Sequence, residues 1–193
     1  MSVDGVEMSE PRSVSDLIAA IESQVDFKYL YFWGHTPDHR RRVGRACLSQ
    51  WWSSRFSVDG TEFATAEHYM MWRKAMLFGN QALAREILTV EHPGHAKSLG
   101  RQVENFDEEE WNEARYQIVV TGNVAKFGQN PDLKKFLLVT GSRVLVEASP
   151  VDRIWGIGVA ADDPRAQDPG QWRGSNLLGF ALMDARTELS ELG

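Results

Sequence analysis

The chain of 193 residues has a single cysteine, Cys47, which excludes an internal disulfide and favours a reducing compartment. It has no apolar run near the roughly 20 residues of a membrane span and no basic-then-apolar leader, so a soluble cytoplasmic protein is expected. The chain also lacks a net positive charge, because 27 Asp and Glu outnumber 21 Lys and Arg and give a net charge of −6. This argues against a broad electrostatic surface for nucleic acid, although it leaves room for a local phosphate pocket.

Standard catalytic and metal-binding motifs are missing as well. The sequence has no GxGxxG, no P-loop and no GxSxG. Glu67-His68 does not belong to an HExxH motif, and Pro-Gly between His92 and His95 favours a loop or a helix start over a zinc ligand pair. We therefore expect no metal and no cofactor, and we interpret Cys47 as a small core residue.

Helical patterns dominate the sequence. Seven helices are predicted to begin near residues 13, 65, 80, 93, 107, 130 and 176, most of them behind a capping residue or a proline. Short strands are predicted at 27–33, 143–148 and 153–159, and Asp-Gly at 59–60 predicts a hairpin over 55–63. The expected fold class is α+β, mainly α: a single compact domain with a few short strands and no regular βα alternation.

The stretch TAEHYMMWRKAMLFG (65–79) places an acid and an amine on one helix face. Glu67 and Lys74 are seven residues apart, which is about two helical turns. Met70 and Met71 lie between them, so the face is largely apolar. Two interpretations stay open, a pair of catalytic groups or an ordinary surface ion pair with the acid favoured by the helix dipole.

Two later stretches carry further candidates. In SPVDRIWGIG (149–158), glycines beside Trp155 would allow a ligand to approach the indole closely. Asp152 either contacts a substrate or caps a turn, and Trp155 either stacks on a ligand or belongs to the core. In WRGSNLLGF (172–180), Asn176 stands where a helix begins, so an N-cap and a ligand contact are both possible.

Four blocks of the sequence resemble the NADAR family: LSQWWSSRF (48–56), TAEHYMMWRKAMLFG (65–79), VEASPVDRIWGIG (146–158) and WRGSNLLGFALMDAR (172–186). AKSLGR (96–101) and AKFGQN (125–130) also match, in order. The resemblance covers about residues 27–190. The expected domains are an N-terminal tail and accessory helix at 1–26, which lie outside the resemblance, and a NADAR-like N-glycosidase domain at 27–191. The chain departs from the common Ser-Asn-Phe of the family at 49–51.

The resemblance implies cleavage of a C–N bond between a base and a 5-phosphorylated ribose. The implied substrates are phosphorylated ribosylamino-pyrimidine intermediates of riboflavin biosynthesis, with ribose 5-phosphate as a product. Two alternatives are an enzyme that removes ADP-ribose from guanine bases and a non-catalytic module that binds ADP-ribose or NAD. The expected partner is therefore a small molecule or an ADP-ribosylated base, with nucleic acid disfavoured and no membrane.

The same resemblance implies roles for particular residues. Glu67 is the candidate general acid and base, and Asp152 is expected to bind ribose hydroxyls or to stabilise a cationic transition state. Lys74 is a candidate nucleophile that forms a Schiff base with the opened sugar, or else it holds the carboxylate in place. The expected substrate-binding residues, including two arginines for the phosphate, are Trp52, Arg101, Trp155, Gly158, Arg173 and Asn176. Lys126 is a weaker phosphate candidate, and Trp172 a second pocket candidate.

Overall fold

The computed structural model describes residues 10–37 and 42–192. In this part of the chain no helix is long and apolar enough to cross a lipid bilayer. The helices are α1 (Val14–Glu22), α2 (Ala66–Leu77), α3 (Gln81–Ile87), α4 (Pro93–Gly100), α5 (Glu108–Gly128), α6 (Pro131–Val139) and α7 (Leu177–Glu191). The strands are β1 (Tyr29–Phe32), β2 (Phe56–Val58), β3 (Thr61–Phe63) and β4 (Val144–Glu147). The prediction of a mainly helical single domain with about seven helices is confirmed.

The hairpin of β2 and β3 follows its sequence signature. The two strands pair antiparallel, with Val58 opposite Thr61. Asp59 and Gly60 both have a positive φ, of 50° and 78°, which is the backbone that a type I′ turn requires. The predicted turn is therefore confirmed.

A parallel pair of strands anchors the centre of the fold. β1 runs beside β4 with Phe32 opposite Glu147, and residues 144–146 of β4 are fully buried. Helix α7 lies directly on β4, because a side-chain carbon at Gly179 would stand 2.0 Å from the Leu145 carbonyl oxygen. The close contact fixes the strand end from which Glu147 projects.

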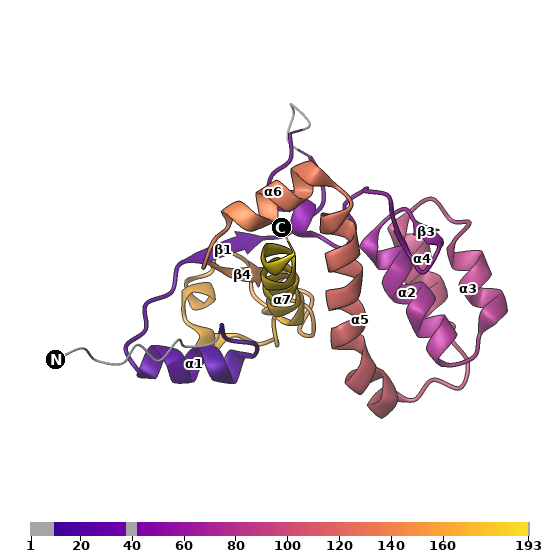
Figure 1. The fold of residues 1–193 in the computed structure, drawn as a ribbon. Coiled ribbons are helices and arrows are strands. Elements are labelled where there is room, and N and C mark those ends of the chain that lie inside the picture. The colour runs from indigo at the N-terminus through magenta and orange to yellow at the C-terminus, as the bar shows by residue number, and fades with distance from the viewer. Residues whose placement is uncertain (1–9, 38–41, 193) are drawn as a thin grey trace.

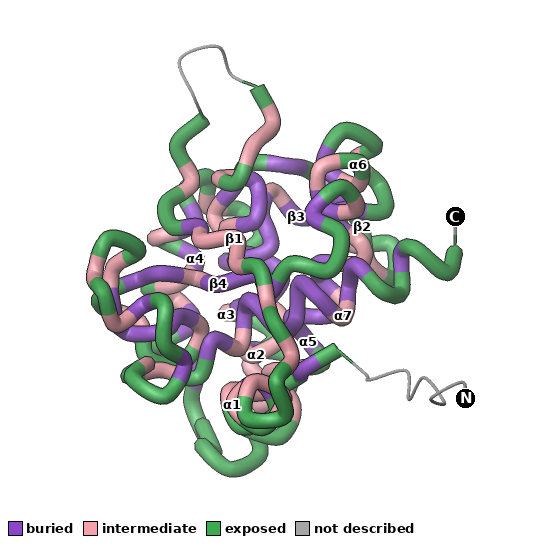
Figure 2. The backbone as a smooth tube through the Cα atoms, turned by 90° about the vertical axis from the view of Figure 1, so that its left-hand side faces the viewer, coloured by how far each residue is buried: buried purple, intermediate pink, exposed green. Residues whose placement is uncertain are grey.

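Helix α5 lies between two groups of elements (Figure 1). On one side are α2, α3, α4 and the hairpin, and on the other are α7, β1, β4 and α1. Gly122 of α5 permits a close approach of α2, since an added side-chain carbon would meet the Tyr69 ring at 2.5 Å. The buried segments form a continuous interior that includes most of α7 and β4 (Figure 2).

The predicted strand at 153–159 is wrong, because this segment has no strand pairing. Asp152 Oδ1 accepts hydrogen bonds from the N–H groups of Ile154 and Trp155, at 2.9 and 2.8 Å, and bends the chain into a turn. Gly158 has a φ of +69°, which an extended strand does not use. The hydrogen bonds from the backbone to the Asp152 side chain have thus outweighed the β propensity of residues 153–159.

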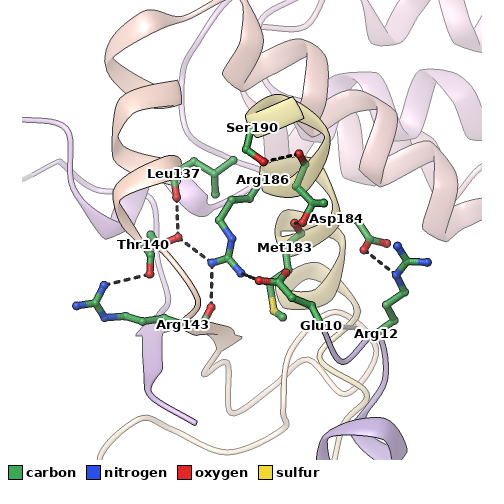
Figure 3. Close-up of polar contacts among 10 residues, drawn as sticks. Glu10, Arg12, Leu137, Thr140, Arg143, Met183, Asp184, Arg186 and Ser190 are labelled. Atoms are coloured by element: carbon green, nitrogen blue, oxygen red, sulfur yellow. Dashed lines mark hydrogen bonds and ion pairs between the residues drawn. The ribbon is translucent and has the colours of Figure 1, made fainter. Parts of the chain in front are cut away.

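The N-terminal helix packs on the rest of the chain. Leu17 is fully buried and belongs to the same core. Just before α1, Glu10 accepts a hydrogen bond from the buried Arg186 guanidinium of α7 at 2.9 Å, and Arg12 pairs with Asp184 at 3.1 Å (Figure 3). Residues 10–12 are therefore attached to α7 through charged side chains.

Candidate active site

The first turn of α2 presents Glu67 to the interior. Thr65 caps the helix by accepting from the His68 N–H, and the Glu67 N–H donates to the Gln50 carbonyl at 3.0 Å. The Glu67 side chain is almost completely buried, and its Oε1 has no hydrogen-bond partner. Burial raises the pKa of Glu67 to about 7, while Lys97 and the nearby Trp51 indole N–H favour the charged form. This carboxyl therefore holds a proton part of the time near neutral pH.

The end of β4 supplies a second perturbed carboxyl, Glu147. Its backbone is held from two sides, because its N–H donates to Asn176 Oδ1 and its carbonyl accepts from the Ile157 N–H, both at 2.9 Å. Its Oε2 is buried without a partner. Burial, together with the negative charges of Asp152 and Glu67, raises the pKa of Glu147 to about 8. Glu147 lies within the block VEASPVDRIWGIG, but no pattern in the sequence marks it as a functional residue.

Three carboxyls and one amine share a recess of about 50 Å³, whose walls include Glu67, Glu147, Asp152, Lys97, Trp51 and Trp155. The recess adjoins an outer cavity of about 420 Å³, which shares Glu147, Asp152, Lys97 and Trp51 with it and adds Trp33 and Val151. Among residues 10–37 and 42–192, no three His, Cys, Asp or Glu side chains are grouped as ligands for a metal ion.

Lys97 is the amine of this site. It lies on α4, lines both the recess and the outer cavity, and has its Nζ 6.0 Å from the centroid of the Trp51 ring. Its charge lowers the pKa of both Glu67 and Glu147. Sequence reasoning missed it because a lone lysine on a short helix looks like a surface charge. The position of AKSLGR between other matching blocks was the available signal.

Lys74 lies elsewhere. Its ammonium donates to the Gly100 carbonyl at 2.9 Å and stands 4.1 Å from the centroid of the Phe106 ring. Neither the recess nor the outer cavity includes it among its lining residues. Burial lowers the pKa of Lys74, with no charged group contributing. Lys74 therefore contacts Gly100 and Phe106, and no contact described for it involves Glu67, with which the sequence pairs it on one helix face.

Asp152 and Trp155 both reach the recess. Asp152 makes the turn described above, which confirms that interpretation, and its side chain also lines the outer cavity, where contact with a substrate stays a prediction. Trp155 is half-buried, and its N–H is one of the two that Asp152 binds. The Asp152 turn therefore also fixes the backbone of the tryptophan that forms part of the recess wall.

Trp52 and Arg101 lie at the edges of the site. Trp52 is nearly buried and lines a neighbouring hollow of about 290 Å³, which shares His35 and Trp51 with the outer cavity. Arg101 ends α4 and is exposed, and its charge contributes to lowering the pKa of Glu67. Neither residue is among those that line the recess or the outer cavity.

Gly158 and Arg173 contact each other. A side-chain carbon added at Gly158 would stand 3.0 Å from the Cβ of Arg173. The lack of a side chain at Gly158 therefore makes room for other residues of the protein, including Arg173. Arg173 is exposed, and its charge lowers the pKa of Asp163 in the polar loop at 160–172. Trp172 packs against Tyr29 and donates to the Ala166 carbonyl, so it stabilises the polar loop at 160–172.

Asn176 holds the site from behind. It is fully buried, its Nδ2 donates to the Leu145 carbonyl at 2.9 Å, and its side chain caps no helix N–H. The prediction that this helix start presents amides to a phosphate is wrong. The N–H groups of residues 176–178 already donate to the carbonyls of Gly156, Ile154 and Trp155. Asn176 is thus bonded to β4 through both ends of its amide.

Trp51 forms the wall between the outer cavity and the neighbouring hollow, and the segment before it is held from inside the protein. The fully buried Lys126 donates to the carbonyls of Cys47 and Ser49 at 2.7 and 2.8 Å. Burial lowers the pKa of Lys126 to about 7, and a neutral amine still has two hydrogens for these two bonds. Lys126 is therefore enclosed by backbone carbonyls and is not exposed to a phosphate.

Comparison with known proteins agrees with this architecture. The NADAR domain model matches residues 31–190. N-glycosidase R617 of Acanthamoeba polyphaga mimivirus is 42% identical over 166 residues, covering 83% of this chain and 96% of that protein. N-glycosidase YbiA of Escherichia coli (strain K12) is 32% identical over 133 residues, covering 69% and 74%. The NMR structure of E. coli YbiA superposes with a TM-score of 0.68 at 27% identity, covering 87% and 89%. The chain belongs to the NADAR family.

Proposed function

We propose that the protein is an N-glycosidase that hydrolyses the C–N bond between a 5-phosphorylated ribose and a base. One observation carries the proposal: two buried carboxyls with raised pKa values face an ammonium group in a single recess. Such carboxyls can donate a proton at neutral pH, which N-glycoside cleavage requires. The names of the relatives R617 and YbiA, both N-glycosidases, support the same class of reaction.

The acid–base route assigns each carboxyl a task. Protonated Glu67 gives its proton to the leaving nitrogen as the C–N bond breaks, and the bonding electrons leave with the base. Positive charge then develops at the anomeric carbon, where Asp152 lies in the same recess to stabilise it. The Glu67 carboxylate next takes a proton from the water that attacks the sugar, which restores the acid. Glu147 serves as the second proton-holding group beside it.

A covalent route remains a proposal alongside the first. An amine would attack the anomeric carbon of the ring-opened imine, the base would leave with a proton, and water would hydrolyse the resulting Schiff base to free the sugar and the amine. Lys97 is the better placed amine because it lines the recess, whereas Lys74 would first have to leave the Gly100 carbonyl.

Borohydride trapping during turnover separates these routes. A ribose adduct that maps to Lys97 supports covalent catalysis by that residue, and an adduct on Lys74 restores the assignment made from the sequence. If no adduct forms in a preparation that turns over, the covalent route is excluded and the acid–base route is supported.

The proposed substrates are phosphorylated ribosylamino-pyrimidine intermediates of riboflavin biosynthesis. ADP-ribosylated guanine is the second candidate, favoured by the hollow beside Trp51, which offers room for a larger molecule. The test is to incubate the protein separately with a ribosylamino-pyrimidine phosphate and with ADP-ribosylated guanosine, and to follow the released sugar by mass spectrometry. Release from neither compound would contradict the N-glycosidase proposal and favour a binding module for ADP-ribose or NAD.

A further inference from the structure

Two large apolar side chains are exposed at the rim of the outer cavity. Trp33, which directly follows β1, is 61% exposed, and Val151, in the turn after β4, is 84% exposed. Both line the outer cavity, although they lie far apart in the sequence. Exposed tryptophans are uncommon in the absence of a partner molecule, so their position at a cavity mouth is informative.

The charges of the site change with depth. The recess holds three carboxyls, whereas the rim residues Trp33, Gly34 and Val151 carry no charge. Lys97 is the one lysine or arginine among the described residues that line either space, and it is shared by both. Among the described residues of the rim a phosphate would therefore find no lysine or arginine, while a flat, neutral ring would find an indole face.

The geometry points to Trp33 and Val151 as a base-binding subsite at the cavity mouth, which holds the planar leaving base while the ribose 5-phosphate lies in the outer cavity beside Lys97. This inference rests on the proposed function, since it names the group that the mouth receives. Trp33 stacks on the heteroaromatic ring, and Val151 contacts the ring from the opposite chain segment.

The two deeper tryptophans have other positions. Trp51 is half-buried, with the rings of His35 and His92 at 5.4 and 5.7 Å between centroids. Trp155 lines the recess beside the carboxyls, where the bond is cleaved. Because Val151 is so exposed, the outer edge of a ring at the mouth remains in solvent.

Binding measurements test this without requiring turnover. The probes are a free triaminopyrimidinone for the mouth and ribose 5-phosphate for the interior, each titrated by calorimetry. Loss of one base–aromatic stack is worth about 1–3 kcal/mol, so Trp33→Ala should weaken pyrimidinone binding by about 5-fold to 150-fold. Trp33→Phe should restore most of it, and the Kd for ribose 5-phosphate should stay unchanged. Val151→Ala should have a smaller effect in the same direction, and Val139→Ala, also highly exposed but on α6, should have none.

Each other outcome is decisive. Unchanged pyrimidinone binding in Trp33→Ala, equal loss of both probes, or no pyrimidinone binding by the wild type would overturn the subsite. Binding of the pyrimidinone that depends on Trp33, in a protein that cleaves no glycoside, would overturn the proposed reaction and leave the subsite standing. Turnover by Trp33→Ala with an unchanged KM would overturn the subsite and leave the proposed reaction standing.

Discussion

Replacing Glu67 with glutamine should stabilise the protein at neutral pH. A carboxyl whose pKa rises from 4.5 in the unfolded chain to about 7 in the fold opposes folding wherever the unfolded chain ionises it. The penalty is absent below about pH 4, grows as the pH rises through 4.5 and reaches its full size above pH 7. At about 1.4 kcal/mol per pKa unit, the full penalty is about 3 kcal/mol. Glutamine keeps the shape of the side chain without the charge.

The free energy of unfolding, from urea denaturation at pH 5 and pH 7.5, measures this effect. Glu67→Gln should gain about 3 kcal/mol at pH 7.5 and less than about 1 kcal/mol at pH 5. Glu113→Gln, an exposed substitution in the second turn of α5, is the matched control and should change little at either pH. If Glu67→Gln is less stable than the wild type at pH 7.5, or gains the same free energy of unfolding at both pH values, the raised pKa of the buried Glu67 is refuted.

Three further predictions concern the same region. Because Glu67 and Glu147 have pKa values of about 7 and 8, kcat/KM should fall as the pH rises from 7 to 9, and a profile flat to pH 10 would exclude them as proton donors. Asn176→Ala should lower the free energy of unfolding by about 2–4 kcal/mol, because it removes two buried hydrogen bonds. Asn176→Gly should lose less, since the φ of 51° suits glycine, and urea denaturation compares the two. In thermal melts, Gly179→Ala should destabilise by about 3 kcal/mol through its clash with the Leu145 carbonyl, whereas Gly128→Ala, which meets only the flexible end of Leu189 at 3.2 Å, should be nearly neutral. Equal effects of the two alanines would contradict the close packing of α7 on β4.

The elements that sequence reasoning found are those with local signals. Thr65 and Asp107 cap α2 and α5 through their own side chains, and Asp59-Gly60 sets the hairpin turn. Such signals act within a few residues, so a single sequence contains them. The segment at 153–159 was mispredicted because its conformation depends on Asp152 and on the carbonyl partners at the start of α7. These contacts are not visible in the β-prone residues of the segment itself.

The candidate site shows the same division. Glu67, Asp152 and Trp155 were selected from the sequence and do meet in the recess. Lys97 and Glu147 join them only through the packing of α4 and β4, which no periodic pattern in the sequence specifies. The choice of Lys74 over Lys97 rested on helical spacing along α2, and spacing cannot show that Gly100 and Phe106 take up the amine.

Single-turnover release of ribose 5-phosphate from a ribosylamino-pyrimidine phosphate tests the central claim most directly. Wild-type protein and Glu113→Gln should release the sugar at the same rate. Glu67→Gln should be slower by about 10²–10⁴-fold, the usual contribution of a positioned general acid, while it remains folded and at least as stable as the wild type at neutral pH. Release by Glu67→Gln at the wild-type rate would contradict the assignment of Glu67 as the acid of this recess.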